Sequence, residues 1–172
     1  MIGRPELERQ VEYGLKHSPV TAILGPRQCG KTTLAREFCT GEDAACFDLE
    51  APEDRAKLAN PQLVLERLRG VVILDEIHRQ PELMMLLRVL ADRRPLPCRF
   101  IVLGSASPDL VRQASNSLAG RIYFVDMGGF TLGEVASEQR DRLWTRGGFP
   151  LSYLADTDVR PSGCRSGLGS GL

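Results

Sequence analysis

Five short apolar runs recur along the chain, and glycine, proline or charged residues bound each of them. Runs of this length, rich in valine, isoleucine and leucine, are typical of strands buried in a sheet. The run from Val71 to Leu74 is apolar at every position, as expected for a strand covered on both faces. The strands predicted from this pattern are Val20–Leu24, Ala45–Leu49, Val71–Glu76, Phe100–Leu103 and Ile122–Val125.

Between these runs the apolar residues follow a helical period. Leu7, Val11 and Leu15 form one stripe of a helix predicted over residues 5–16. A second stripe, in the helix opened by Pro81 and Glu82, is expected to lie in the core and consists of Leu83, Leu86, Leu87 and Leu90. Strands that alternate with helices predict an α/β fold, in which helices cover both faces of a parallel sheet.

Several helix starts are marked by capping residues. Asn60 and Ser107 each precede a proline, which suits the first position of a helix, and the helix after Asn60 is expected to reach Gly70. Thr131 and Glu134 have the spacing of a capping box ahead of a short helix.

The turn after the first predicted strand carries a phosphate-binding signature, because the segment from Gly25 to Thr32 fits the pattern G-x-x-x-x-G-K-[ST]. Glycines let successive backbone N–H groups point into one concavity, and the helix that follows adds its positive end. Lys31 can then reach the β- and γ-phosphates, and the Thr32 hydroxyl can bind Mg²⁺. A glycine-rich turn with a surface lysine is the alternative. The predicted nucleotide-binding residues are Gly25, Pro26, Arg27, Gln28, Cys29, Gly30, Lys31, Thr32 and Thr33.

Two acids, Asp75 and Glu76, close the third predicted strand. In a P-loop protein the first acid holds Mg²⁺, with Thr32 as the other metal residue. The second acid can polarise the attacking water as a general base. The two acids could instead form a solvated turn that caps the next helix. P-loop kinases usually lack the neighbouring glutamate, so the pair favours hydrolysis over phosphate transfer to a small acceptor.

Two further residues are candidates for contact with the phosphates. Ser105 follows the fourth predicted strand, and it either contacts the γ-phosphate or forms a turn with its own backbone. Parallel strands place Gly25, Asp75 and Ser105 at one edge of the sheet, where ligands bind in such folds. Arg121 precedes the fifth strand and is either an arginine finger, acting in cis or on a neighbouring subunit, or an ordinary surface arginine.

Composition narrows the class of protein. The 172 residues balance 22 acids with 22 bases, which argues against a broad electrostatic footprint for nucleic acid. The five cysteines show no zinc-binding spacing, and reduced thiols are expected. No apolar run approaches the ~20 residues that a membrane span needs. We therefore expect a cytoplasmic protein that does not enter membranes.

Several motifs together resemble a family of prokaryotic AAA-type ATPases, in which a P-loop domain precedes a C-terminal domain of uncharacterised function. The stretches that carry the resemblance are GPRQCGKTTLAREF, FDLEAPEDRAKLANPQ, VVILDEIHRQPEL, FIVLGSASPDLVRQASNSLAGR and RGGFP. The resemblance implies a P-loop NTPase three-layer sandwich with a parallel sheet of about five strands, and ATP with Mg²⁺ as ligands. It also implies Walker A at Gly25–Thr32, Walker B at Asp75 and Glu76, a sensor-like Ser105, and Arg121 as a finger candidate.

The sequence departs from this family at two places. His78 stands where these proteins more often carry glutamine, and we expect it to have a helix-start or packing role. The resemblance spans nearly everything from Arg4 to about Ala155. We therefore predict an AAA-type ATPase core over residues 1–155, followed by a tail rich in glycine, serine and arginine at residues 156–172. We expect this tail to be disordered and the chain to be a truncated or frameshifted form of the family protein.

The sequence thus predicts Mg²⁺-dependent ATP binding and hydrolysis, with Lys31, Glu76, Ser105 and Arg121 as the catalytic candidates. The alternative is a nucleotide-gated interaction module with little turnover, whose partner could be a protein or DNA. A homo-oligomer is also compatible with the sequence.

Overall fold

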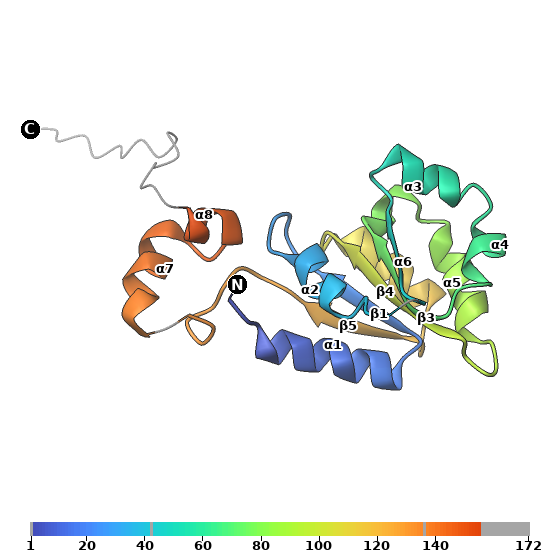
Figure 1. Cartoon of the computed structure of the whole chain (residues 1–172), viewed down its shortest axis with the longest axis horizontal. Helices are drawn as coiled ribbons and strands as arrows, with labels where there is room; N and C mark the ends of the chain where they lie inside the picture. The colour runs from blue at the N-terminus through green and yellow to red at the C-terminus, as the bar shows by residue number, and fades with distance from the viewer. Residues whose placement is uncertain (1, 42, 136, 156–172) are drawn as a thin grey trace, which may run out of the picture.

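The computed structural model of the protein describes residues 2–41, 43–135 and 137–155, and it is built around a five-stranded sheet (Figure 1). Every pair of neighbouring strands is parallel, and the strand order is β2-β3-β4-β1-β5. The strands are β1 Val20–Leu24, β2 Ala45–Asp48, β3 Gly70–Asp75, β4 Cys98–Gly104 and β5 Ile122–Asp126. The predicted parallel sheet of five strands is therefore confirmed.

The helices form one layer on each side of this sheet, as the sequence predicts. Alternate strand residues face opposite sides: Ile23 and Ile73 pack with α1 and α2, whereas Val72 and Leu74 pack with residues of α4, α5 and α6. The helices are α1 Pro5–His17, α2 Lys31–Glu37, α3 Pro52–Lys57, α4 Pro61–Leu65, α5 Leu83–Ala91, α6 Pro108–Ser117, α7 Arg140–Arg146 and α8 Pro150–Leu154, with 3₁₀ turns η1 Ile77–Arg79 and η2 Ser137–Gln139.

The α7–α8 segment lies to one side of the layered part of the molecule (Figure 1). It exposes several large apolar side chains, and Trp144 is the most exposed of them at 91%. This tryptophan is the single one in the sequence. Among the described residues no helix is both long and apolar enough to cross a bilayer.

Most expected element boundaries agree with the structure to within one or two residues, and two of the differences have a clear physical cause. The helix after Asn60 ends at Leu65 rather than near Gly70, because the chain then tightens into i+3 turns at Arg67 and Leu68. The third strand ends at Asp75, because Glu76 has a left-handed backbone with φ of 53°. The leucine stripe of α5 lies in the core, as predicted.

Two predicted caps and the predicted thiols can also be checked. The Ser107 hydroxyl accepts a hydrogen bond from the Leu110 amide at 3.3 Å, which confirms the cap of α6. The Glu134 carboxylate accepts from the Thr131 amide at 2.7 Å, as a capping box requires, although a turn rather than a helix follows directly. The described cysteines are free thiols, and Cys164 of the predicted disordered tail lies outside the described residues.

Candidate functional site

The loop between β1 and α2 has the backbone of an anion-binding concavity. Gln28 and Gly30 both have left-handed backbones, with φ of 64° and 97°, between residues of other conformation. Alternation of this kind turns successive N–H groups to one side. Within the described chain, the amides from Gly30 to Thr33 have no backbone acceptor, so they are free to bind a ligand.

Hydrogen bonds to the loop hold the side chain of Lys31 over it. Its ammonium group donates to the carbonyl oxygens of Gly25 at 2.9 Å and Pro26 at 2.8 Å, and the residue is only 6% exposed. A buried ammonium needs such partners. The contacts place a fixed positive charge beside the free amides, where phosphate oxygens would lie.

Gly25 allows the loop to pass close to the strand beside it. A Cβ atom at this position would lie 2.0 Å from the carbonyl oxygen of Met127, which follows β5. The first glycine of the motif is therefore required by close packing against backbone.

Thr32 and Asp75, the two predicted metal residues, are in direct contact. The Thr32 hydroxyl donates to Oδ2 of Asp75 at 2.7 Å, although the residues come from α2 and the end of β3. Hydroxyl and carboxylate oxygens suit Mg²⁺, which also takes phosphate oxygens and water as ligands. The described residues contain no group of three or more His, Cys, Asp or Glu side chains able to hold a metal. The Thr32–Asp75 pair offers two oxygen ligands, and phosphate oxygens and water would complete the coordination of Mg²⁺ there.

Glu76 is oriented by its neighbours on both sides. Its backbone amide donates to Oδ1 of Asp75 at 2.8 Å, so one carboxylate contacts both Thr32 and Glu76. The Glu76 carboxylate lies 3.1 Å from Nδ1 of His78. The packing role expected for His78 is thus a contact with the candidate general base, which sequence spacing did not suggest.

Ser105 lies at the same edge of the sheet as the loop and Asp75. Because β4 runs between β1 and β3, the residue after β4 lies between the P-loop and the end of β3. Ser105 is half-buried, and its carbonyl accepts from the Ser107 amide at 2.8 Å. The structure therefore brings together Gly25–Thr32, Asp75, Glu76 and Ser105.

Arg121 is not brought to this edge. It precedes β5 in a parallel sheet, which places it at the amino ends of the strands, and its backbone carbonyl accepts from the amide of Val20. Its guanidinium binds Asp92 side-on, with distances of 2.6 and 2.9 Å. This geometry corrects the expectation that Arg121 could act in cis, and it leaves two alternatives, a contribution to another subunit or an ordinary surface arginine paired with Asp92. The position before a strand, rather than after one, is the sequence signal that indicates this placement.

Arg27 contributes to an exposed network at the mouth of the site. Its guanidinium lies 3.6 Å from the carboxylate of Glu50, which also binds Arg79 at 2.7 Å. Glu50 follows β2 and Arg79 lies in η1. The network therefore connects the P-loop with the segments after β2 and β3. The side chain of Cys29, in contrast, is buried.

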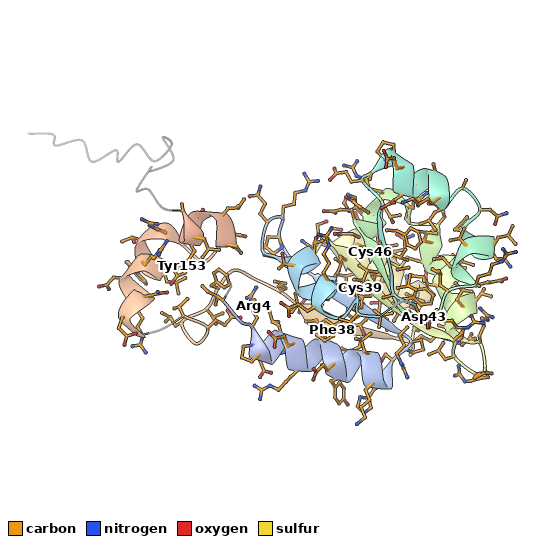
Figure 2. The ribbon with its side chains drawn as sticks, in the orientation of Figure 1. Arg4, Phe38, Cys39, Asp43, Cys46 and Tyr153 are labelled. Carbon is orange, nitrogen blue, oxygen red and sulfur yellow. The ribbon has the colours of Figure 1, made fainter. Side chains whose placement is uncertain are left out.

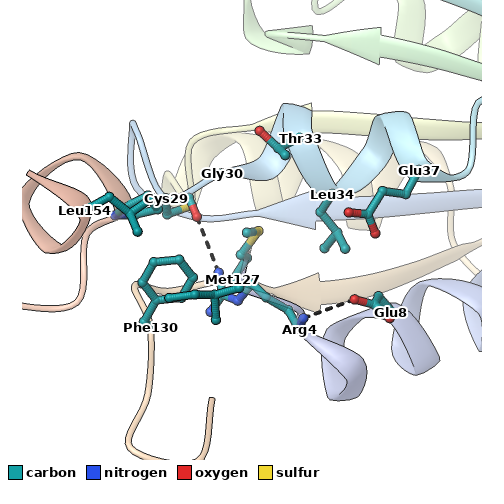
Figure 3. Close-up of a pocket in the computed structure, with 12 residues that line it drawn as sticks. Arg4, Glu8, Cys29, Gly30, Thr33, Leu34, Glu37, Met127, Phe130 and Leu154 are labelled. Atoms are coloured by element: carbon teal, nitrogen blue, oxygen red, sulfur yellow. Dashed lines mark hydrogen bonds between the residues drawn. The ribbon is translucent and has the colours of Figure 1, made fainter. Parts of the chain in front are cut away.

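A cavity of about 240 Å³ lies beside the P-loop, and sequence analysis did not predict it (Figure 3). Gly30 and Thr33 form one wall, and residues from the N-terminal segment and from the stretch after β5 form the others. Most of its surface is apolar, and the lining includes Ile2, Leu34, Met127, Phe130, Pro150 and Leu154. The walls come from both ends of the described chain, so no local pattern could have indicated the cavity.

Comparison with known proteins identifies the family. The family model of an AAA domain matches residues 17–136. Uncharacterised proteins from Mycobacterium bovis and Mycobacterium tuberculosis are each 44% identical to this chain over 167 residues, which is 97% of it. The chain spans about 38% of the length of these relatives.

A solved structure shares the fold. The Walker-type ATPase of Pyrococcus abyssi superposes with a TM-score of 0.62 at 18% identity, covering 87% of this chain and 65% of that one. The sheet, the loop and the matched residues lead to one assignment: this chain belongs to the AAA-type P-loop ATPase family.

Proposed function

We propose that this chain binds ATP together with Mg²⁺ and hydrolyses it. The observation that carries the proposal is the contact between Thr32 and Asp75 directly beside Lys31 and the free loop amides. These groups lie on three separate segments of the chain, and each suits one part of a metal–triphosphate ligand.

The proposed roles follow from the chemistry of each group. Lys31 and the amides from Gly30 to Thr33 would bind the phosphates, and Thr32 and Asp75 would hold the metal. Mg²⁺ bound there would neutralise the negative charge of the phosphates. Glu76 would accept a proton from the attacking water, with its carboxylate oriented by His78.

The cavity beside the P-loop would hold the nucleoside part of the same ligand. It adjoins Gly30 and Thr33, and apolar side chains dominate its lining. Nucleotide-sized ligands are typically held in such largely apolar pockets with a few polar groups. This arrangement supports a nucleotide, rather than free phosphate, as the ligand.

A nucleotide-gated interaction module is the second candidate, and exposed apolar side chains favour it. Leu154 lines the cavity and is 52% exposed, while Trp144 and Leu151 are 91% and 66% exposed on the same α7–α8 segment. A ligand in the cavity would therefore contact a segment that could bind a partner protein. The partner and the oligomeric state belong to this second proposal.

Thermal unfolding with and without MgATP tests the binding proposal. A ligand at 100 times its Kd stabilises a protein by about 2.7 kcal/mol, which for a chain of this size raises Tm by roughly 5–10 °C. We expect this shift in the wild type and its loss in Lys31→Ala. A well-folded wild type that shows no shift with MgATP would contradict the proposal.

A further inference from the structure

Arg4 is a buried arginine that the proposed mechanism does not use, and every N–H group of its side chain has a partner. It precedes α1, is 7% exposed, and lies where the sheet meets the segment that leads to α7 (Figure 2). Nε and Nη2 donate to the two carboxylate oxygens of Glu134 at 2.7 and 3.2 Å. The remaining donors reach the carbonyl oxygens of Cys29 at 3.3 Å, Gly128 at 3.0 Å and Gly129 at 3.0 Å.

These contacts use the full donor set of a guanidinium, which has five N–H groups in a fixed planar arrangement. A lysine has three donors on one nitrogen and cannot bind a carboxylate and three carbonyls in this way. Burial of an arginine is costly unless all of these partners are present. The site is therefore built specifically for arginine, although the proposed phosphate and metal contacts do not require this residue.

The partners of Arg4 belong to two segments that contribute walls to the cavity, the P-loop through Cys29 and the stretch after β5 through Met127 and Phe130. Cys29 is part of the P-loop, and Figure 3 shows its hydrogen bond with Arg4. Gly128, Gly129 and Glu134 belong to the stretch after β5. The guanidinium also lies 5.4 Å from the ring centre of Phe130, which lines the cavity. Arg4 thus fixes the distance between the phosphate-binding loop and the far wall of the cavity.

Glu134 is itself held in place and charged. Its carboxylate accepts from the amide and the hydroxyl of Thr131 at 2.7 and 3.0 Å. Burial alone would raise the pKa of Glu134, but the hydrogen bonds from Arg4 and Thr131 outweigh it and hold the pKa below its ordinary value. The pair therefore consists of two fixed, opposite charges at neutral pH.

We infer that Arg4, through its ion pair with Glu134, is a positioning residue. It holds the P-loop and the nucleoside cavity at the relative position that allows one nucleotide to bind both. The inference rests on the proposed function and deepens it. Arg4 also lines the cavity, but every donor of its side chain already has a protein partner, so it has no hydrogen bond left to give to a ligand. The phosphate site has its own supports, namely the Lys31 contacts and the hydrogen bond from the Gly25 amide to the Gly104 carbonyl.

Two ligands separate this role from a general structural one. MgATP occupies both the phosphate site and the cavity, whereas magnesium tripolyphosphate occupies only the phosphate site. In Glu134→Gln, which keeps the size of the side chain but removes its charge and one acceptor, we expect the Kd of MgATP to rise about tenfold, as is typical of coupling between sites. Tripolyphosphate affinity should stay within about twofold of the wild type, since its contacts are unchanged.

Arg4→Lys provides an independent variant, because it keeps the positive charge and loses the planar donor set. It should lower the preference for MgATP over tripolyphosphate as Glu134→Gln does, and it should raise KM while leaving kcat unchanged. The matched control is Asp92→Asn, which removes the carboxylate from the side-on pair with Arg121 at the other end of the sheet. The control should leave both affinities unchanged.

The outcomes distinguish the inference from the proposal beneath it. An unchanged preference, or equal weakening of both ligands, would overturn the positioning role while leaving the proposed function intact. If the wild type binds neither ligand, the proposed function fails and the positioning role fails with it. Circular dichroism and Tm of each variant without ligand will verify that the comparison is made between folded proteins.

Discussion

Each end of the parallel sheet carries a side-on arginine–carboxylate pair, and the two pairs differ mainly in their surroundings. The Nε to carboxylate distances are 2.7 Å for Arg4–Glu134, beside the P-loop, and 2.6 Å for Arg121–Asp92, at the amino ends of the strands. The side chains of the first pair are 8% and 12% exposed, whereas those of the second are 30% and 52% exposed.

The difference shows that geometry alone does not reveal what an ion pair does. Water screens an exposed pair, so its net contribution to stability is small. A buried pair that loses one member leaves an uncompensated charge, which is strongly unfavourable. Only the pair beside the P-loop also connects segments that line a ligand site, so the carboxyl end of the sheet is expected to tolerate less change than the amino end.

The largest expected effect on stability comes from replacing a glycine by alanine at the carboxyl end of the sheet, and the matching replacement at the amino end is its comparison. Gly25→Ala would place Cβ 2.0 Å from the Met127 carbonyl oxygen, so backbone must move and we expect a loss of about 3–4 kcal/mol in the free energy of unfolding. At the amino end, the Cβ of Gly120→Ala meets no atom within 4 Å, and only the left-handed backbone, with φ of 73°, opposes it. That variant should cost about 1 kcal/mol.

Urea unfolding of both glycine variants measures the difference directly. Equal losses would mean that the sheet tolerates change equally at its two ends, contrary to the comparison. MgATP should produce no Tm shift in Gly25→Ala, because the loop that carries the free amides would be displaced.

The next effect concerns turnover rather than stability. Glu76→Gln removes the proposed general base and should lower kcat by about 100-fold or more, while the Tm shift with MgATP remains. Arg121→Gln should leave kcat unchanged in dilute protein, since Arg121 is far from the phosphate site of its own chain. Steady-state ATPase assays over a range of protein concentrations check both expectations.

The assays also separate the two candidate functions. A Glu76→Gln chain that hydrolyses ATP at the wild-type rate would rule out the proposed catalytic role. A defect of Arg121→Gln that grows with protein concentration would reveal a contribution to a neighbouring subunit, and the amino end of the sheet would then take part in catalysis after all.

The smallest effect is the stability that each ion pair supplies. Glu134→Gln should lower the free energy of unfolding by about 2 kcal/mol, because it leaves Arg4 buried without its counter-charge. Asp92→Asn should produce a barely measurable change, because that pair is exposed to solvent. When unfolding is measured in low and in high salt, the higher salt concentration should reduce the effect of Asp92→Asn on the free energy of unfolding. It should leave the effect of Glu134→Gln nearly unchanged.

The direction in which the Arg4–Glu134 pair changes stability with pH can also be checked. The pKa of Glu134 lies below its ordinary value of 4.5, so its pair stabilises the fold fully above that value. The stabilisation is lost as pH falls below 4.5 and through the folded pKa, since the carboxylate then takes up a proton. The stability difference between wild type and Glu134→Gln should therefore shrink between pH 5 and pH 3, and a difference that grows on acidification would contradict the assignment.

Local signals made much of the fold predictable from the sequence. Val20–Leu24 and Val71–Leu74 are apolar runs that only buried strands explain well, and the spacing from Gly25 to Thr32 fixes a loop between a strand and a helix. The meeting of Thr32 and Asp75 also followed from the sequence, because both residues come after parallel strands whose carboxyl ends share an edge.

What the sequence did not reveal depends on long-range contacts. Arg4 is one arginine in an arginine-rich chain, and its partners Cys29 and Glu134 lie 25 and 130 positions away. No period or motif connects residues at such separations. The same reason explains the cavity, whose walls come from both ends of the described chain. The contact of His78 with Glu76 is local, but it depends on the left-handed backbone of Glu76, which no sequence pattern indicated.

The composition of the cavity wall has a consequence for how the molecule is made. Ile2 and Leu154 both line the cavity, so its walls span nearly the whole described chain. During translation the N-terminal helix, the P-loop and the first strands leave the ribosome well before α8 does. A nascent chain would therefore acquire the phosphate site first and complete the nucleoside cavity only after residue 154 has emerged. The proposed binding of ATP would then stabilise chains that extend past residue 154 more than shorter ones, because only the longer chains offer both parts of the site.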